Sequence, residues 1–387
     1  MTKNNMRKTR VSSYKVENNA SKKKKKKAMK KAKPKVKIKK RKEHELEIEE
    51  NTNILKEENN LPNIKSLESD VLKYIIGQDE HIKEIVTAIY KAKKFKTLDS
   101  TILIIGNSGT GKTATIKQIA KRLNIPYTIE DATKYTQEGY WGANVEDIIY
   151  NLLENAQYDF EKAKNGIIIV DEIDKKSGHD EHDVAGVKVL ESMLKITEGT
   201  IIKIPDPNDP FAEETQDFDT KDIIFIFLGA FSGMDKIRDK RLNNNPLGFV
   251  NPQNQKQNAQ KNCFLKQDLV EYGMTEEFVG RIDTIIEMNK LTKQDLALIL
   301  KKSELSIFRK YQEELRSKGI TLVYDENLFE LIAEKSMALD TGARELSNTV
   351  NYIFAKILYD VLANPNKYSN CKLFLEIVED NTKYELS

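Results

Sequence analysis

A glycine-rich loop between a short apolar run and a helical pattern constrains the fold of this chain more than its other features do. The loop follows the β-branched run Thr101–Ile105 and comprises Gly106, Asn107, Ser108, Gly109, Thr110, Gly111, Lys112 and Thr113. In such a strand–loop–helix unit, backbone N–H groups and the helix dipole hold a phosphate group. The lysine reaches the β- and γ-phosphate oxygens, and the threonine hydroxyl binds Mg²⁺. The sequence therefore predicts a nucleotide site with Mg²⁺.

Two adjacent carboxylates end another strongly apolar run. Residues 167–170 are Ile-Ile-Ile-Val, and Asp171 and Glu172 follow them directly. An aspartate at the carboxyl end of such a strand can hold Mg²⁺, and a glutamate beside it can polarise the water that attacks a phosphoryl group. Because Lys112 and Glu172 are both present, we predict hydrolysis of the nucleotide and not binding alone.

Apolar runs alternate with helical patterns through the middle of the chain. The predicted strands are 101–105, 126–129, 167–170, 223–228 and 284–288, and this alternation favours an α/β fold with a parallel sheet covered on both faces. After residue 288 the pattern becomes mostly helical, with helices expected near 292–317, 326–338 and 343–362 and strand-like pieces at 320–324 and 372–378. We therefore expect a large domain over 61–288 and a smaller one over 289–387.

The first sixty residues differ from the rest in charge. Residues 1–42 carry a net charge of +19 and the remainder −16, while residues 43–60 are acidic and Asn-rich. Like charges with little apolar surface cannot pay the entropy of ordering, so we predict a disordered Lys-rich tail and an acidic linker over 1–60. The tail could keep the protein in solution, contact nucleic acid through counterion release, or act in targeting.

Composition excludes several other classes of protein. The sequence contains no apolar run long enough to span a membrane and no apolar signal segment near its start, so we expect a cytoplasmic protein without a membrane partner. Cys263 and Cys371 are too few for a disulfide framework or a four-cysteine zinc site. His179 and His182 lie in a short acidic stretch, where we do not expect a structural metal.

From residue 61 onward the chain resembles the AAA+ unfoldases of the ClpX type, with the related HslU subfamily behind it. The resemblance rests on residues 155–175 around the paired carboxylates, on the segment 74–78, and on further motifs in the family's order. It implies an AAA+ P-loop domain with a five-stranded parallel sheet between helices, a smaller, mainly helical C-terminal domain, and ATP with Mg²⁺ as ligands. Ile75 and Ile76 match the family's adenine-contacting segment.

Two arginines match further motifs of that family. Arg281 ends the segment 277–281, which resembles the segment whose arginine reaches the γ-phosphate of a neighbouring subunit. Arg344 ends the segment 341–344, which resembles the sensor-2 motif of the small domain. The resemblance thus implies a homohexamer with nucleotide at its interfaces, in which both arginines stabilise the transition state. The alternative for each is an ordinary surface salt bridge.

The resemblance also suggests what the motor contacts. Tyr140 and Trp141 lie between two glycines, where the family has a pore loop that grips unfolded protein substrates; a packed core pair is the alternative. Leu247, Gly248 and Phe249 resemble the tripeptide that docks on the peptidase ClpP; the alternative is a loop folded onto its own domain. The family's basic recognition loop has no counterpart, since residues 205–219 are acidic, and no polar sensing residue can be named in the strand 223–231.

Three functions remain open at this point. The first is an ATP-dependent unfoldase and translocase that feeds a ClpP-type peptidase, and the second is the same motor acting alone as a remodeller. The third is a nucleic-acid-associated ATPase switch that uses the basic tail. The family's N-terminal zinc module has no counterpart in this sequence, so adaptors that use that module are not expected.

Overall fold

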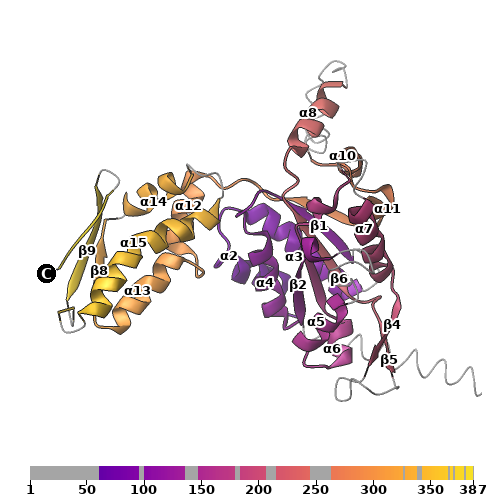
Figure 1. Ribbon diagram of the computed structural model, residues 1–387, viewed down its shortest axis with the longest axis horizontal. Coiled ribbons are helices and arrows are strands. Elements are labelled where there is room, and N and C mark those ends of the chain that lie inside the picture. The colour runs from indigo at the N-terminus through magenta and orange to yellow at the C-terminus, as the bar shows by residue number, and fades with distance from the viewer. Residues whose placement is uncertain are drawn as a thin grey trace, which may run out of the picture. The chain divides into compact units, whose positions relative to one another are not determined.

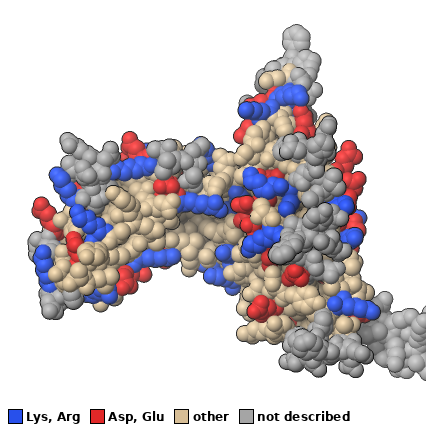
Figure 2. All heavy atoms as spheres, viewed as in Figure 1, with Lys and Arg blue, Asp and Glu red and all other residues tan. Residues whose placement is uncertain are grey.

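The structure is a computed structural model that describes residues 61–95, 100–135, 147–178, 184–205, 215–244, 263–325, 327–337, 342–364, 367–368, 371–378 and 381–386. The predicted tail and linker over 1–60 lie outside these residues. Among the helices described, none combines the length and the apolar character needed to cross a lipid bilayer. On the face shown in Figure 2, Lys and Arg side chains are interspersed with Asp and Glu side chains over the described residues. Neither sign of charge dominates this face.

A five-stranded parallel sheet forms the centre of the first half of the described chain. Its strands are β1 (Thr101–Ile105), β2 (Tyr127–Asp131), β3 (Ile167–Asp171), β6 (Ile224–Gly229) and β7 (Thr284–Glu287), in the order β2-β3-β6-β1-β7. All four pairings are parallel. Each strand matches a predicted one with small shifts at its ends, so the predicted α/β fold with a five-stranded parallel sheet is confirmed.

Apolar side chains alternate between the two faces of this sheet, and both faces are covered. In β6, Ile224, Ile226 and Leu228 join one buried cluster, whereas Phe225 and Phe227 join the other. The first cluster includes side chains of α2 (Ile64–Leu72), α3 (Asp79–Phe95) and α4 (Lys112–Leu123). The second includes α5 (Asp147–Asn155), α6 (Phe160–Lys164), α7 (Val184–Thr197), α10 (Lys266–Glu271) and α11 (Glu276–Arg281). Figure 1 shows these two layers on either side of the sheet.

Short elements connect the strands, and one of them was not predicted. The 3-10 helices η1 (Ala132–Lys134) and η2 (Ile173–Lys176) follow β2 and β3, and α8 (Met234–Asn244) follows β6. An antiparallel hairpin pairs β4 (Ile201–Pro205), which precedes the acidic stretch noted above, with β5 (Thr215–Asp219), which ends that stretch. It buries Ile202, Ile204 and Phe218 in the core beside the sheet. In β5 a single apolar residue, Phe218, stands among polar and acidic residues and gives no strand pattern, although its burial holds the strand in place.

The second half of the described chain is mainly helical, as predicted, with differences in detail. It contains α12 (Lys293–Lys302), α13 (Ile307–Ser317), α14 (Asn327–Met337) and α15 (Ala343–Ala363) around one buried cluster. A three-stranded sheet in the order β10-β9-β8 adds β8 (Thr321–Tyr324), β9 (Lys372–Val378) and β10 (Asn381–Leu386). The strand β10 was not predicted, because its sequence is polar and pairs only at the sheet edge.

The predicted single helix over 292–317 is wrong, because two serines divide it. Ser303 has extended backbone angles at the end of α12, and the Ser306 side chain accepts the Arg309 N–H at the start of α13. The Ser303 hydroxyl also donates to the Tyr74 carbonyl. A serine that caps a following helix also competes with the helix before it, and here that competition ends α12.

Buried polar contacts join the segment 74–78 to the start of the helical half. The side-chain amide of Gln78 pairs with the backbone of Asn289, donating from Nε2 (2.7 Å) and accepting at Oε1 (3.2 Å). Gly77 has a φ of +81°, and a Cβ atom there would lie 2.7 Å from Cγ of Asp295. Asp295 in turn forms the capping box of α12 with Thr292. A side chain at position 77 would therefore disturb both its own backbone and the helix cap.

We predict that Gly77→Ala lowers the free energy of unfolding by about 2 kcal/mol, from left-handed backbone strain and a weakened cap. Thermal unfolding of the full chain measures the effect. Gly233→Ala is the matched control, because Gly233 also has a positive φ (+92°) but no atom within 4 Å of the added Cβ. Equal melting temperatures for the two variants would show that the contact with Asp295 contributes nothing.

Candidate functional site

The carboxyl ends of β1, β3 and β6 meet at one edge of the sheet and bring the predicted motifs together. Ile105 lies opposite Gly229, and Val170 lies opposite Phe227. The Gly106 N–H continues this pairing by donating to the Gly229 carbonyl at 3.1 Å. The glycine-rich loop, the paired carboxylates and the turn after β6 are therefore neighbours, as the rule for open parallel sheets leads one to expect.

The loop leads into α4 through a backbone conformation that only glycine adopts easily. Gly111 is the N-cap of α4 with a φ of +100°, so no side-chain group blocks the first N–H groups of the helix. The Lys112 side chain curls back over the loop, and its Nζ donates to the carbonyl oxygens of Gly106 and Asn107. This geometry presents backbone N–H groups and one cation to the same space, which suits an anion.

Burial lowers the pKa of Lys112 below its ordinary value. The carboxylates of Asp171 and Asp174 oppose this effect, while the positive charge of Arg344 adds to it. The Lys112 ammonium is thus largely desolvated, with two carboxylates and the Arg344 guanidinium close to it. A group in this setting interacts strongly with a ligand phosphate, because little water screens the charges.

The Thr113 hydroxyl and the Asp171 carboxylate contact each other across the two motifs. Thr113 Oγ1 donates to Asp171 Oδ2 at 3.0 Å, and the Glu172 N–H donates to Asp171 Oδ1 at 2.9 Å. Glu172 has left-handed backbone angles (φ 58°, ψ 34°), which are costly for a residue with a side chain and are often found at functional sites. The two facing oxygens of Thr113 and Asp171 are hard donors of the kind that Mg²⁺ prefers.

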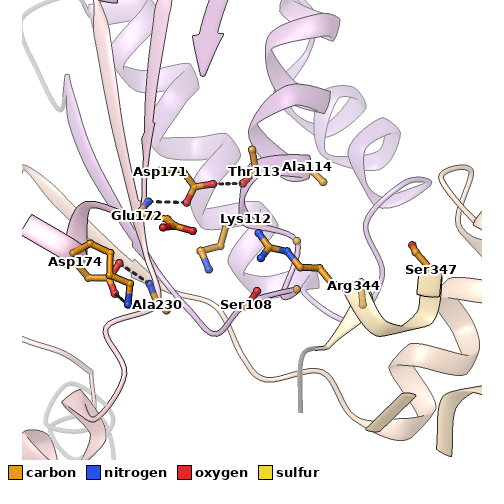
Figure 3. A pocket seen from close by; sticks show the side chains of 14 residues that line it. Ser108, Lys112, Thr113, Ala114, Asp171, Glu172, Asp174, Ala230, Arg344 and Ser347 are labelled. Carbon is orange, nitrogen blue, oxygen red and sulfur yellow. Dashed lines mark hydrogen bonds and ion pairs between the residues drawn. The ribbon is translucent and has the colours of Figure 1, made fainter. Parts of the chain in front are cut away.

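These residues surround a cavity of about 370 Å³. Residues from both halves of the described chain line it: Ser108, Gly109, Gly111, Lys112, Thr113, Ala114, Asp171, Glu172, Asp174, Lys175, Ala230, Ala343, Arg344 and Ser347. Figure 3 shows the Arg344 side chain extending from α15 toward Lys112, with Asp171 and Glu172 on the other side of the lysine. The structure thus brings together eight residues that the sequence singled out: Ser108, Gly109, Gly111, Lys112, Thr113, Asp171, Glu172 and Arg344.

A direct backbone contact places Arg344 at the cavity. The Ala343 N–H donates to the Gly109 carbonyl at 3.2 Å. Gly342 has a φ of +57°, and a Cβ atom there would lie 2.9 Å from the Ser108 carbonyl oxygen. The start of α15 therefore packs backbone to backbone on the glycine-rich loop, and a glycine is required at that contact.

A second, more apolar cavity of about 170 Å³ lies beside the same loop. Its walls include Ile75, Ile76 and Gly111 from the first half and Leu300 and Leu346 from the second. Ile75 is buried, and its side chain approaches Gly111 closely. An apolar slot that adjoins a phosphate-binding loop suits a flat heteroaromatic ring.

Arg281 is not among the residues that line either cavity. It ends α11 with 56% of its side chain exposed and forms an ion pair with Glu198 just beyond α7. Tyr140, Trp141, Leu247, Gly248 and Phe249 lie outside the described residues, as do His179 and His182. Within the described residues, no cluster of three metal-ligating side chains of the His, Cys, Asp and Glu types is found.

Several residues of the cavity were missed at the sequence level, among them Ala230 and Asp174. Ala230 directly follows β6, in the segment where no polar side chain could be named, and its backbone N–H donates to the buried carboxylate of Asp174 at 3.3 Å. Asp174 lies in the same acidic motif as Glu172, and only the fold distinguishes it from a surface acid. The signal available in the sequence was a third carboxylate close behind the predicted catalytic strand.

Two protein-family models match the chain. Residues 98–285 match the AAA domain of the Cdc48 subfamily, and residues 291–369 match the C-terminal, D2-small domain of ClpB protein. The two matches correspond to the half that contains the parallel sheet and to the mainly helical half.

Curated relatives named ATP-dependent Clp protease ATP-binding subunit ClpX are similar over most of the chain. Those of Borrelia duttonii (strain Ly) and Borrelia recurrentis (strain A1) are each 35% identical over 340 residues, covering 80% of this chain and 79% of the relative. The relative from Treponema denticola is 33% identical over 324 residues, covering 78% of this chain and 77% of its own length. Together with the geometry of the cavity, this similarity shows that the chain belongs to the ClpX family of AAA+ ATPases.

Proposed function

We propose that this ATPase is an ATP-driven protein unfoldase and translocase that works as a homohexamer and feeds a ClpP-type peptidase. The observation that carries the proposal is the convergence of Lys112, Thr113, Asp171, Glu172 and Arg344 on one cavity. The names of the relatives, which designate the ATP-binding subunit of a Clp protease, support the peptidase partner. Two separated free cysteines, Cys263 and Cys371, are compatible with the cytoplasm.

The predicted residues that meet at the cavity have distinct roles in phosphoryl transfer. The loop 106–113 cradles the phosphates, Lys112 pairs with the β- and γ-phosphate oxygens, and Glu172 polarises the attacking water. Thr113 and Asp171 would hold Mg²⁺, which neutralises charge on the phosphates when bound. Arg344 stabilises the transferring group from the same subunit, and the adenine lies against Ile75 and Ile76 in the apolar cavity. The large domain is then 61–288 and the small domain 289–387.

The position of Arg281 supports a ring. An exposed arginine that does not line its own cavity can reach the nucleotide of a neighbouring copy, and a head-to-tail interface of this kind can close into a cyclic oligomer. Tyr140 and Trp141 would then grip unfolded chains in the central pore, and Leu247, Gly248 and Phe249 would dock on the peptidase. Six copies of a weak contact around one symmetric partner gain affinity by avidity.

We expect Lys112→Ala to abolish nucleotide binding or turnover, and Glu172→Gln to retain ATP while hydrolysis stalls. The reason is that the lysine contacts phosphate, whereas the glutamate acts only on the water. Equilibrium binding of a fluorescent ATP analogue and steady-state phosphate release measure the two effects. Lys121→Ala, on the exposed face of the same helix, is the control for the loss of a lysine. A Glu172→Gln protein with normal turnover would sink the assignment.

Arg281→Ala should leave ATP binding intact and lower hydrolysis by roughly 10³, the scale known for arginines that act in trans. Rings mixed from Arg281→Ala and Lys112→Ala subunits should regain turnover, because some interfaces then contain an intact loop and an intact arginine. Arg309→Ala removes another partly exposed arginine in an ion pair (Nη1–Oε2 2.7 Å to Glu304) and should have little effect.

The same experiment separates a trans role from a surface ion pair. Glu198→Gln breaks the pair with Arg281 inside the chain and should preserve hydrolysis. If Glu198→Gln lowers turnover as much as Arg281→Ala does, or if assembled mixed rings recover nothing, the arginine acts within its own subunit and the trans assignment is wrong.

Phe249→Ala should spare ATP hydrolysis and unfolding and prevent degradation of a tagged substrate by the peptidase, because the docking contact is lost while the motor is untouched. Degradation and unfolding of a fluorescent protein, measured side by side, report the two activities. Absence of nucleotide-dependent association between the wild-type ring and any ClpP-type peptidase of its own cell would contradict the docking role and favour a remodeller that acts alone.

A further inference from the structure

The carboxylate of Asp174 is buried at the floor of the phosphate cavity, with only 3% of the residue exposed. It lies in η2, two positions after Glu172, and reaches across to the turn after β6. Its Oδ1 accepts the Ala230 N–H and its Oδ2 accepts the Phe231 N–H, both at 3.3 Å. One side chain thus connects the turn that carries Glu172 to the turn that carries Ala230, as Figure 3 shows.

Both of the turns that Asp174 connects have costly backbone conformations. Glu172 has a φ of 58° and Phe231 a φ of 49°, although neither is glycine. Left-handed angles are unfavourable for a residue with a side chain, so such conformations persist only where neighbouring contacts hold them. At Phe231, the hydrogen bond from its backbone N–H to Asp174 is a contact of this kind. Glu172 is the N-cap of η2, and η2 contains the same aspartate.

The packing around Asp174 leaves it little freedom. The Phe231 ring is buried and lies 5.1 Å from the Tyr272 ring, centroid to centroid. A Cβ atom at Gly229 would collide with the Phe231 ring and lie 3.0 Å from Asp174 Oδ1. Opposite charge is supplied by Lys175, whose Nζ lies 3.6 Å from Asp174 Oδ2. The carboxylate is therefore fixed by packing on one side and by hydrogen bonds on the other.

We propose that Asp174 is a positioning residue for ATP hydrolysis, whose carboxylate sets the separation between the Glu172 turn and the backbone at Ala230. Ala230 lines the cavity at the strand end where the sequence offers no polar sensing side chain. The backbone at Ala230, held by Asp174, then forms the wall of the cavity where a polar sensing side chain would otherwise lie. The inference rests on the proposed function, because it concerns the placement of the group that activates water.

Asp174→Asn is the informative variant, because it keeps the size of the side chain and removes one of the two acceptors. The amide would place N–H groups against a backbone N–H, so one of the two bonds is lost. We expect kcat to fall roughly 10- to 100-fold, the scale of a misplaced catalytic group, with KM and ADP affinity within about threefold of wild type. Asp174→Glu keeps the charge but not the position, and it should lose kcat as well.

The control is Glu130→Gln, which also removes a buried, hydrogen-bonded carboxylate. Glu130 lies on β2, accepts hydrogen bonds from the side chains of Thr128, Tyr135 and Asn151, and is not among the residues that line the cavity. Gly229→Ala acts on the same contact from the other side and serves if Asp174→Asn does not fold. Steady-state kinetics, binding of fluorescent ADP and thermal unfolding are measured for each variant.

A fall in kcat with unchanged KM in Asp174→Asn or Gly229→Ala, and not in Glu130→Gln, would support the inference. It is overturned if Asp174→Asn keeps kcat within about twofold of wild type, if kcat and ADP binding fall together, or if Asp174→Glu is fully active. It is also overturned if Glu130→Gln loses kcat to the same extent. A wild-type protein that hydrolyses no ATP would overturn the proposed function first, which distinguishes the two failures.

Discussion

The register of the parallel sheet is the constraint on which the rest of the structure depends. Pairing of Ile105 with Gly229 and of Val170 with Phe227 brings three strand ends to one edge, and each end contributes a different part of the site. The end of β1 contributes the loop with Lys112 and Thr113, β3 contributes the carboxylates, and β6 contributes the backbone at Ala230. A slip of one residue would turn each strand's side chains to the opposite face, so the two buried clusters fix this register.

The second half of the described chain completes the cavity through backbone contacts near the same loop. Gly342 and Ala343 lie against Ser108 and Gly109, while Gln78 pairs with Asn289 where the two halves join. These contacts are hydrogen bonds and, at Gly342, close packing of backbone on backbone. A ligand that contacts both the loop and Arg344 would bind most tightly to one arrangement of the two halves. It would therefore favour that arrangement over others.

Much of this architecture could be predicted because its signals are local. The strand β3 reads as four apolar residues before two acids, and the loop 106–113 requires its glycines. The hairpin β4–β5, the strand β10 and the break between α12 and α13 could not be predicted in the same way. They depend on packing partners and caps, such as Phe218 in the core and Ser306 at a helix start, that a single sequence does not reveal. Asp174 was missed for the same reason, since its burial comes from the turn after β6.

The central claim is that two adjoining cavities hold the nucleotide: the phosphates bind at the sheet edge beside the start of α15, and the adenine binds in the apolar cavity. The most direct measurement is an experimental structure of the full chain with ADP and Mg²⁺. The account predicts the β-phosphate within hydrogen-bonding distance of Lys112, the adenine against Ile75 and Ile76, and the Arg344 side chain on the phosphate side of the cavity. Nucleotide bound elsewhere on the chain, or in these two cavities with the base and phosphates exchanged, would contradict it.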